Sequence, residues 1–253
     1  MKFLSQFERQ DGVFVLSDLC TDFEESYLRV RKKEGRVLTD EMVRNLPQTP
    51  NNYRHCEEWK LREFTANRAL SYFQQKKFET VLDLGCGNGW FTNALANNSN
   101  QVVGLDMNMH ELKQASRVFG KPGLSFCYAD VFTSGLPKGT FSLVTINAAI
   151  QYFSNLEALI NRLLDLLTPD GEIHILDSPL YKPHEVASAQ KRTEHYFTEI
   201  GLPEMAENYF HHSENVFQNF NYKVLFKPNQ LKNKVTRKLG FSTSPFPWIV
   251  IKK

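Results

Sequence analysis

The stretch TVLDLGCGNGWF at residues 80–91 constrains the fold of this chain more than any other. A short apolar run ends in an aspartate, and glycine then occupies three alternate positions, Gly85, Gly87 and Gly89. Glycines after a buried strand let the chain turn sharply and let backbone N–H groups approach a ligand without obstruction by Cβ atoms. Trp90 then begins a helix whose positive end faces the same place. The stretch therefore predicts a corner that binds a nucleotide or a cofactor.

From residue 80 onward, short β-branched or apolar runs alternate with helical patterns, which is the sequence form of repeated βαβ units and a parallel sheet. Strands are predicted at 80–84, 101–106, 124–129, 141–147 and 171–178. Helices are predicted at 89–97, 109–118, 155–167 and 184–200. Beyond Gly201 the patterns favour strands near 221–226 and 247–253, with an aromatic-rich helical piece at 203–220.

The region before the glycine loop has a different pattern. Residues 18–78 show apolar and aromatic residues at three- and four-residue spacing, which predicts helices, and LPQTPNNYR at 46–54 interrupts them with two prolines. We therefore expect an N-terminal helical extension or lid at 1–78 and a cofactor-binding domain at 79–253, with 203–220 as an insertion on the substrate side.

Composition excludes several classes of protein. The chain has 253 residues, of which 42% are hydrophobic and 23% charged, as in ordinary folded domains. No apolar run approaches the ~20 residues that cross a bilayer, and the charged N-terminus does not resemble a signal peptide, so we expect a cytoplasmic protein without membrane contact. The four cysteines are scattered without a CxxC pair, which predicts independent thiols and no metal site.

The spacing of the glycines separates two kinds of cofactor. A dinucleotide fingerprint is GxGxxG, whereas this loop is GxGxG and has Trp90 where the third glycine would stand. An indole there would obstruct the close packing and the approach of a pyrophosphate that the third glycine permits. An NAD-dependent oxidoreductase is therefore the alternative and not the first choice.

Residues 81–89, VLDLGCGNG, resemble the first motif of the class I S-adenosylmethionine-dependent methyltransferases, apolar-apolar-D/E-x-GxGxG. The resemblance covers about residues 80–178 and identifies no subfamily. It implies a Rossmann-like doubly wound α/β sheet of seven mostly parallel strands, the last antiparallel. It also implies S-adenosylmethionine as the cofactor and S-adenosylhomocysteine as the product.

The resemblance also implies which residues meet the cofactor. Asp106 would receive the ribose hydroxyls, a role that its two acceptor oxygens suit independently, and Asp130 would accept from the adenine amino group. Whether Trp90 faces the sulfonium or only packs is open. The full implied set is Asp83, Gly85, Cys86, Gly87, Gly89, Trp90, Asp106, Met107, Asp130, Val131 and Asn147.

The reaction expected is a direct displacement, which requires alignment of acceptor, methyl carbon and sulfur and needs no metal. A hydroxyl acceptor would gain from a general base, whereas an amine or a carboxylate presents a lone pair. The sequence identifies no catalytic residue. Four residues are candidates for a catalytic role at the acceptor site, namely Tyr152, Asp177, Tyr181 and His195.

The acceptor itself is expected to be a small molecule enclosed by the additions at both ends. Tyr53, Trp59 and Arg62 are the expected lid residues beside the cofactor. Basic clusters at 29–33 and 227–238 leave RNA open as an acceptor, although solvated faces explain them more simply at a net charge of +2. A binding protein that has lost catalysis is a further alternative, and the oligomeric state is not indicated.

Overall fold

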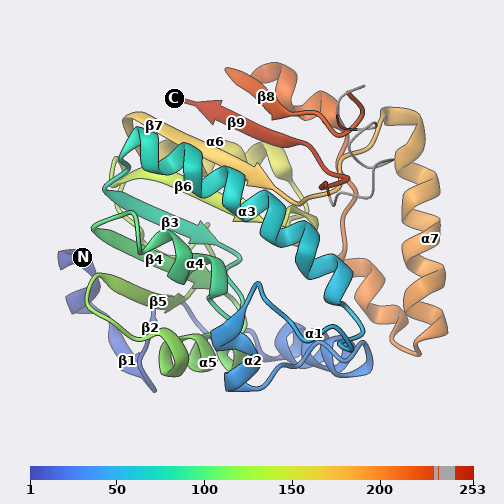
Figure 1. The fold of residues 1–253 in the computed structure, drawn as a ribbon, viewed down its shortest axis with the longest axis horizontal. Coiled ribbons are helices and arrows are strands. Elements are labelled where there is room, and N and C mark those ends of the chain that lie inside the picture. Colours follow the sequence, from blue (N-terminus) through green and yellow to red (C-terminus); the bar gives the residue numbers. More distant parts are fainter. Residues whose placement is uncertain (231–232, 234–242) are drawn as a thin grey trace.

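The computed structural model describes residues 1–230, 233 and 243–253, and the described strands form one sheet of nine (Figure 1). Their order across the sheet is β1-β2-β5-β4-β3-β6-β7-β9-β8. The strands are β1 Glu8–Gln10, β2 Val13–Val15, β3 Thr80–Leu84, β4 Gln101–Asp106, β5 Leu124–Tyr128, β6 Phe141–Asn147, β7 Leu167–Leu176, β8 Tyr222–Phe226 and β9 Trp248–Lys252.

The centre of the sheet is parallel, as the alternating pattern predicts. Pairs β3 with β4, β4 with β5, β3 with β6 and β6 with β7 are all parallel, and β9 runs antiparallel to both β7 and β8. Strands β4 and β5 lie on one side of β3, whereas β6 and β7 lie on its other side, so the order of the strands switches at β3. Ligands bind outside the carboxyl ends of the strands at such a point, and the glycine loop follows β3 there.

The sheet has nine described strands where seven were expected, and the extension at 1–78, expected to be helical, contributes two of them. Strands β1 and β2 form an antiparallel hairpin, and β2 continues the sheet beside β5 in parallel. The turn between them is Asp11-Gly12, with φ of 49° and 86°. An Asp-Gly pair at positive φ is typical of a two-residue hairpin, so the sequence does contain a signal for it.

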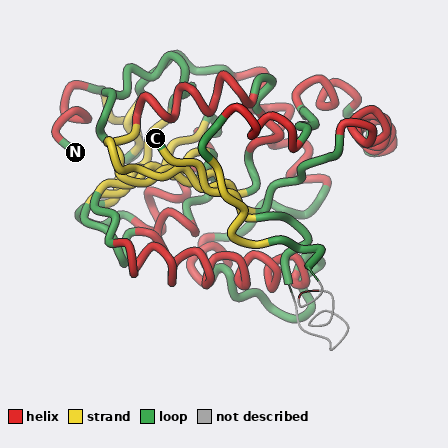
Figure 2. Tube along the Cα trace, turned by 90° about the horizontal axis from the view of Figure 1, so that it is seen from above, coloured by secondary structure: helices red, strands yellow, loops and turns green. Residues whose placement is uncertain are grey.

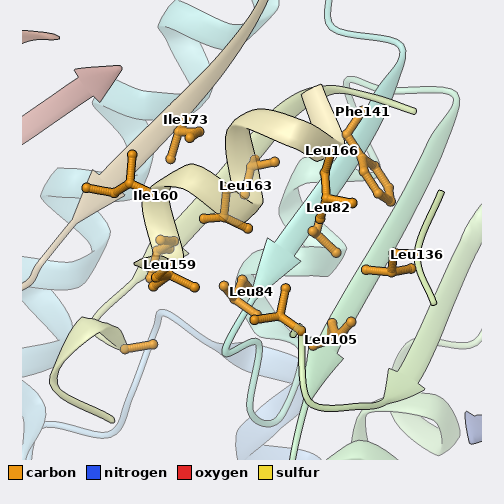
Figure 3. Packing of buried hydrophobic residues seen from close by; sticks show 14 of the residues in the cluster. Leu82, Leu84, Leu105, Leu136, Phe141, Leu159, Ile160, Leu163, Leu166 and Ile173 are labelled. Atoms are coloured by element: carbon orange, nitrogen blue, oxygen red, sulfur yellow. The ribbon is translucent and has the colours of Figure 1, made fainter. Parts of the chain in front are cut away.

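Helices cover both faces of the sheet (Figure 2). Successive side chains of a strand point to opposite faces, and β3 follows this rule. Val81 packs with residues of α3 (Cys56–Lys76), α4 (Trp90–Leu95) and α5 (Met109–Phe119), whereas Leu82 and Leu84 pack with α6 (Leu156–Leu166). Leu159, Leu163 and Leu166 of α6 meet Leu82, Leu84 and Leu105 in Figure 3.

The α-helices follow the predicted ranges closely after residue 80. They are α1 Thr21–Lys33, α2 Asp40–Asn45, α3 Cys56–Lys76, α4 Trp90–Leu95, α5 Met109–Phe119, α6 Leu156–Leu166 and α7 Val186–Glu199. Side chains of Asn108 and Asn155 accept hydrogen bonds from the first turns of α5 and α6, which fixes where each helix begins. Segment 203–220, expected to be helical, forms two short 3-10 helices, η4 Pro203–Asn208 and η5 Glu214–Asn219.

The junction between α6 and β7 differs from the expectation, which left a connection between a helix at 155–167 and a strand at 171–178. Strand β7 begins at Leu167, directly after the helix, and Leu167 pairs with Phe141. The register then jumps, since Leu143 pairs with Glu172, so residues 168–171 form a bulge within the strand. Proline is tolerated at such a bulge because no ladder hydrogen bond is needed there.

No helix in the described part of the chain is long and apolar enough to span a membrane.

Candidate active site

The glycine loop is tied to the neighbouring strand β4. The amide nitrogens of Gly85 and Cys86 lie 2.8 and 3.2 Å from the carbonyl oxygen of Leu105. All three loop glycines have positive φ, of 71°, 51° and 77° in chain order. A Cβ atom added to Gly85 would stand 2.4 Å from the Cβ of Ala149, so the close approach itself requires glycine.

A cavity of about 520 Å³ opens above this loop. Its walls come from α1, from α3, from the loop and from the segments that follow β6 and β7. Of the eleven residues expected to contact the cofactor, six line it, namely Asp83, Gly85, Cys86, Gly87, Trp90 and Asn147. The other five do not, namely Gly89, Asp106, Met107, Asp130 and Val131.

The N-terminal segment lies over the ends of β4 and β5, where the adenosine part was expected. The amide of Cys20 donates to the hydroxyl of Tyr128 at 2.7 Å, and the amide of Asp130 donates to Ser17 Oγ at 3.1 Å. Glu24 accepts from the amide of His110 at the start of α5. The expected cofactor contacts around Asp83 and the glycine loop are thus open to the cavity. The expected adenosine contacts around Asp106 and Asp130 are covered by the N-terminal segment.

Two carboxyl groups are held near the loop, Asp83 buried and Asp106 partly buried. Asp83 is 1% exposed and accepts hydrogen bonds of 2.7 Å from the hydroxyls of Thr92 and Thr145; burial outweighs these bonds and raises its pKa to about 6. Burial and the nearby charge of Glu111 raise the pKa of Asp106 to about 7. A raised pKa at a cavity, as for Asp83, is typical of functional sites.

Several buried polar atoms at this cavity have no hydrogen-bond partner among the described residues. They are Asn147 Oδ1, Gln151 Oε1, Asp177 Oδ2 and Arg31 Nε, and all four residues line the cavity. Ala148 and Asp177, which follow β6 and β7, have positive φ of 55° and 43°. Unpaired buried groups and strained backbone are costly, and both are typical of a site that a ligand completes. Three of the orphaned atoms are acceptors, which suits the ammonium group of a methionine moiety.

A charged cluster borders the same cavity on α3. Glu58 binds Arg36 at 2.6 Å and Arg62 at 2.9 Å; burial opposes the ionised form, but these two cations lower the pKa of Glu58 to about 2. The Arg62 guanidinium also lies 5.3 Å from the ring centre of Trp59, which packs edge-on against Trp90 at 5.4 Å. Trp59 and Arg62 therefore line the cavity as expected of lid residues, and Trp90 both packs and faces it.

The expected contact of Tyr53 with the cofactor cavity is not seen, since its hydroxyl donates to the carbonyl of Gly35 and it is not among the lining residues. His195 lines neither this cavity nor the second cavity described below. Its side chain is 75% exposed and lies 3.3 Å from Glu199 on the outer face of α7, so the structure does not bring it to the site.

A second cavity of about 260 Å³ adjoins the first. It lies between α1, α7 and η4, and five residues line both cavities, namely Tyr27, Arg31, Glu34, Tyr152 and Tyr209. Tyr152 stands between the rings of Tyr27, at 5.7 Å, and Tyr209, at 5.9 Å. Tyr181 lines the second cavity and Asp177 the first, so three of the four acceptor-site candidates are at these cavities.

Some lining residues were not expected from the sequence, chiefly Tyr27, Arg31, Glu111 and Tyr209. The interpretation of residues 29–33 as a solvated face is wrong for Arg31, whose side chain is 21% exposed, although it holds for Arg29 at 60%. The apolar spacing of Phe23, Tyr27 and Val30 marks the inner face of α1, and Arg31 adjoins that face. Most of the cluster 227–238 lies outside the described residues.

The parallel sheet, the GxGxG loop at its switch point and the cavity above it are the arrangement expected of the class I S-adenosylmethionine-dependent methyltransferase family. Residues 75–239 match the model of a methyltransferase domain family. The match covers more than half of the chain, and the chain belongs to this family. It confirms the resemblance seen in the first motif and decides against the dinucleotide alternative.

Similar proteins agree with this assignment. An uncharacterized methyltransferase of Mycobacterium tuberculosis is 31% identical over 98 residues, 39% of this chain and 50% of that protein. The chain thus spans about half the length of this curated relative. A methyltransferase structure from Mesorhizobium loti has a TM-score of 0.54 at 19% identity, covering 78% of this chain and 98% of the other.

A second solved structure was determined with the product of the expected cofactor. It is a phosphoethanolamine N-methyltransferase of Haemonchus contortus in complex with phosphomonomethylethanolamine and S-adenosylhomocysteine. Its TM-score is 0.55 at 14% identity, and the match covers 91% of this chain and 60% of that one. At these identities the likeness establishes the α/β fold and not the acceptor.

Proposed function

We propose that this chain transfers the methyl group of S-adenosylmethionine to an oxygen or nitrogen atom of a small molecule held in the second cavity. The observation that carries the proposal is the continuity of the two cavities. Tyr27, Tyr152 and Tyr209 line both, so a ligand on the glycine loop and a ligand in the second cavity would meet at these rings. A volume of about 260 Å³ suits a small acceptor.

S-adenosylmethionine, when bound, supplies a methyl group on a positively charged sulfur. The residues of this chain would hold its methionine part over the loop, because Asp83 and the orphaned acceptors Asn147, Gln151 and Asp177 border that end of the cavity. The ring of Trp90 borders the same space and suits a cation.

The adenosine part requires the segment before α1 to shift. Ser17 and Cys20 of this segment and Glu24 in the first turn of α1 make three hydrogen bonds to groups of β5, α5 and the residues after β5, near the expected adenosine site. The amide of Leu16 adds a fourth, to the carbonyl of Tyr128 at 2.9 Å. These bonds are few and replaceable by water. We therefore assign Asp106 and Asp130 to a cofactor-bound state in which the segment has moved.

The chain's contribution to the reaction is alignment and exclusion of water. Tyr152 stands at the passage between the cavities, and packing against Tyr27 and Tyr209 fixes its ring. Positioning alone can account for roughly 7–11 kcal/mol of a displacement barrier. No group in the described residues needs to form a covalent bond to the acceptor.

The test uses S-adenosylmethionine labelled in the methyl group, offered with either a small-molecule fraction of a cell extract or total RNA. Label in small-molecule products supports the proposal, because a pocket of this size takes only a small acceptor. RNA is the competing acceptor, and binding through phosphates would weaken steeply with salt. Label that enters only RNA would replace a small acceptor by RNA.

A further inference from the structure

The second cavity carries a net positive wall. Its charged lining residues are Arg31, Arg192 and Glu34. Glu34 is already occupied, because Arg36 Nε lies 3.0 Å from its carboxylate and the hydroxyl of Tyr196 donates to it. The two arginines are therefore opposed by one carboxylate that is itself neutralised from outside the cavity.

Arg31 stands where the two cavities meet. Its closest carboxylate is Glu111, at 3.6 Å from Nη2, and its guanidinium lies 5.7 Å from the ring centre of Tyr27. Its Nε is buried without a hydrogen-bond partner among the described residues. An unsatisfied buried donor on a cation calls for an acceptor, and a planar guanidinium binds carboxylates through two parallel N–H groups.

Three tyrosine hydroxyls add neutral donors to the same space. Tyr27, Tyr181 and Tyr209 line the cavity, and the described residues offer none of their hydroxyls a hydrogen bond. Burial raises the pKa of all three, so at neutral pH they stay protonated and can donate. The cavity thus offers an array of donors around a cation.

A general base is missing from this lining in the described residues. Glu34 is paired, the tyrosines are protonated, and His211 lies behind the lining with Thr193 Oγ1 2.9 Å from its Nε2. The acceptor must then attack with a lone pair that needs no prior loss of a proton. At neutral pH an amine is largely a protonated cation, which the arginines repel, whereas a carboxylate is an anion that they attract.

We propose that the acceptor is a small carboxylic acid, bound as its anion by Arg31 and the tyrosine hydroxyls and methylated on a carboxylate oxygen. This inference rests on the proposed function. A lone pair of the carboxylate oxygen forms the new O–CH₃ bond, the S–CH₃ bond breaks, and its electron pair remains on sulfur. The negative charge of the carboxylate and the positive charge of the sulfonium cancel, and no proton is released.

The experiment distinguishes methyl esters from other products by their lability. Protein, methyl-labelled S-adenosylmethionine and the small-molecule fraction of a cell extract are incubated, and the products are treated with mild base. Methyl esters release volatile labelled methanol, whereas methyl ethers and methylamines do not. Base-labile label supports the inference. Base-stable label, or no transfer above the enzyme-free control, overturns it.

Calorimetric titration of the same preparation with S-adenosylhomocysteine distinguishes failure of the carboxylate inference from failure of the proposed function. Binding together with base-stable products contradicts the carboxylate alone. Absence of binding contradicts the proposed function as well.

Variants locate the anion site. Arg31→Gln should lower the transfer rate at fixed extract concentration by about tenfold or more, with S-adenosylhomocysteine affinity unchanged. Arg29→Gln is the matched control, since Arg29 lies on the same helix with a 60% exposed side chain, and it should transfer normally. Tyr209→Phe keeps the ring and removes one donor, so it gives the same test if Arg31→Gln does not fold. Full transfer by both would overturn the assignment.

Discussion

The amide nitrogen of Gly87 lies 2.8 Å from Oδ2 of Asp106, so a hydrogen bond joins the glycine loop to the carboxylate that ends β4. The other oxygen, Oδ1, accepts from the amide of Asn108 at 2.9 Å. The acid that would receive the ribose hydroxyls is therefore preset by the loop that would hold the methionine. Both halves of the cofactor site share one piece of backbone.

The pKa of Asp106 predicts a pH dependence of cofactor binding. Burial, and then the charge of Glu111, raise it to about 7, so the carboxyl is protonated below that value. Ribose hydroxyls donate to the ionised form, and binding should then release a proton near pH 7. We expect the affinity for S-adenosylhomocysteine to fall from pH 8 to pH 6, by up to about tenfold per unit below the pKa. Calorimetry in buffers of different ionisation enthalpy measures the proton; a flat profile contradicts the role.

Asp83→Asn should weaken cofactor binding without lowering the stability of the fold. The buried carboxylate has a raised pKa, so at pH 8 its ionised form costs folding free energy that the amide does not. The hydroxyls of Thr92 and Thr145 can rotate to accept from the amide. We expect the free energy of unfolding to be equal or about 1 kcal/mol higher, with affinity for S-adenosylhomocysteine about tenfold weaker. Urea unfolding and calorimetry on one preparation measure both quantities, and a marked loss of stability would argue against this.

Gly89→Ala should destabilise the fold strongly. At φ of 77°, an added Cβ would stand 2.7 Å from both Ala115 Cβ and a ring carbon of Phe126, between the loop, α5 and β5. Left-handed strain and overpacking together cost about 2–4 kcal/mol. Gly139→Ala is the matched control, with φ of 65° and no heavy atom within 4 Å, and should cost about 1 kcal/mol. Equal losses in urea unfolding would show that the contact is not tight.

A buried network in β7 predicts acid sensitivity. Trp248 Nε1 donates to His174 Nδ1 at 2.9 Å, so the ring is neutral and its Nε2 donates to Glu172 at 3.0 Å. Burial lowers the pKa of His174 below 6.5; it opposes ionisation of Glu172 too, but hydrogen bonds from His174 and Lys252 outweigh it and lower the pKa of Glu172 to about 2. Both folded-state pKa values lie below the unfolded ones.

The folded state therefore binds fewer protons, and the stability from this network is complete above pH 6.5. It is lost as pH falls, through His174 first and through Glu172 between about 4.5 and 2. Glu172→Gln should cost about 3 kcal/mol at pH 7 and flatten the slope of stability below pH 4.5. Exposed Glu157→Gln on α6 should do neither. Chemical unfolding at a series of pH values across this range measures the effect. A slope of stability against pH that is unchanged in Glu172→Gln would contradict the role of the network.

The central strands were predictable because each is a short β-branched or apolar run between helical patterns. The hairpin β1–β2 was not, because strands of three residues carry too little alternation, and only the Asp-Gly pair at 11–12 marks it. Most of the bulge at 168–171 was placed outside the strand predicted at 171–178 because its proline and glycine suit a turn as well as a bulge. Local signals do not reveal which of the two the sheet requires.

The candidate site also has a part that the sequence predicts and a part that it does not. The glycine loop lies in the continuous stretch 80–91, so its spacing could be recognised, and five of the expected residues in that stretch line the first cavity. The second cavity joins Arg31 of α1 to Tyr209 after η4, and such a contact depends on packing that no local pattern encodes. Arg31 was interpreted together with its basic neighbours, although it is the one cationic residue of 29–33 that lines the cavities.

The most direct measurement is calorimetric titration of S-adenosylhomocysteine into the wild-type protein and Asp106→Ala, with Glu157→Ala as a surface control and NADH as a second ligand. The account predicts binding to the wild type and the control, an affinity at least about tenfold weaker in Asp106→Ala, and no binding of NADH. Equal affinity in all three proteins, or binding of NADH instead, would contradict the assignment of the glycine loop and Asp106 to this cofactor.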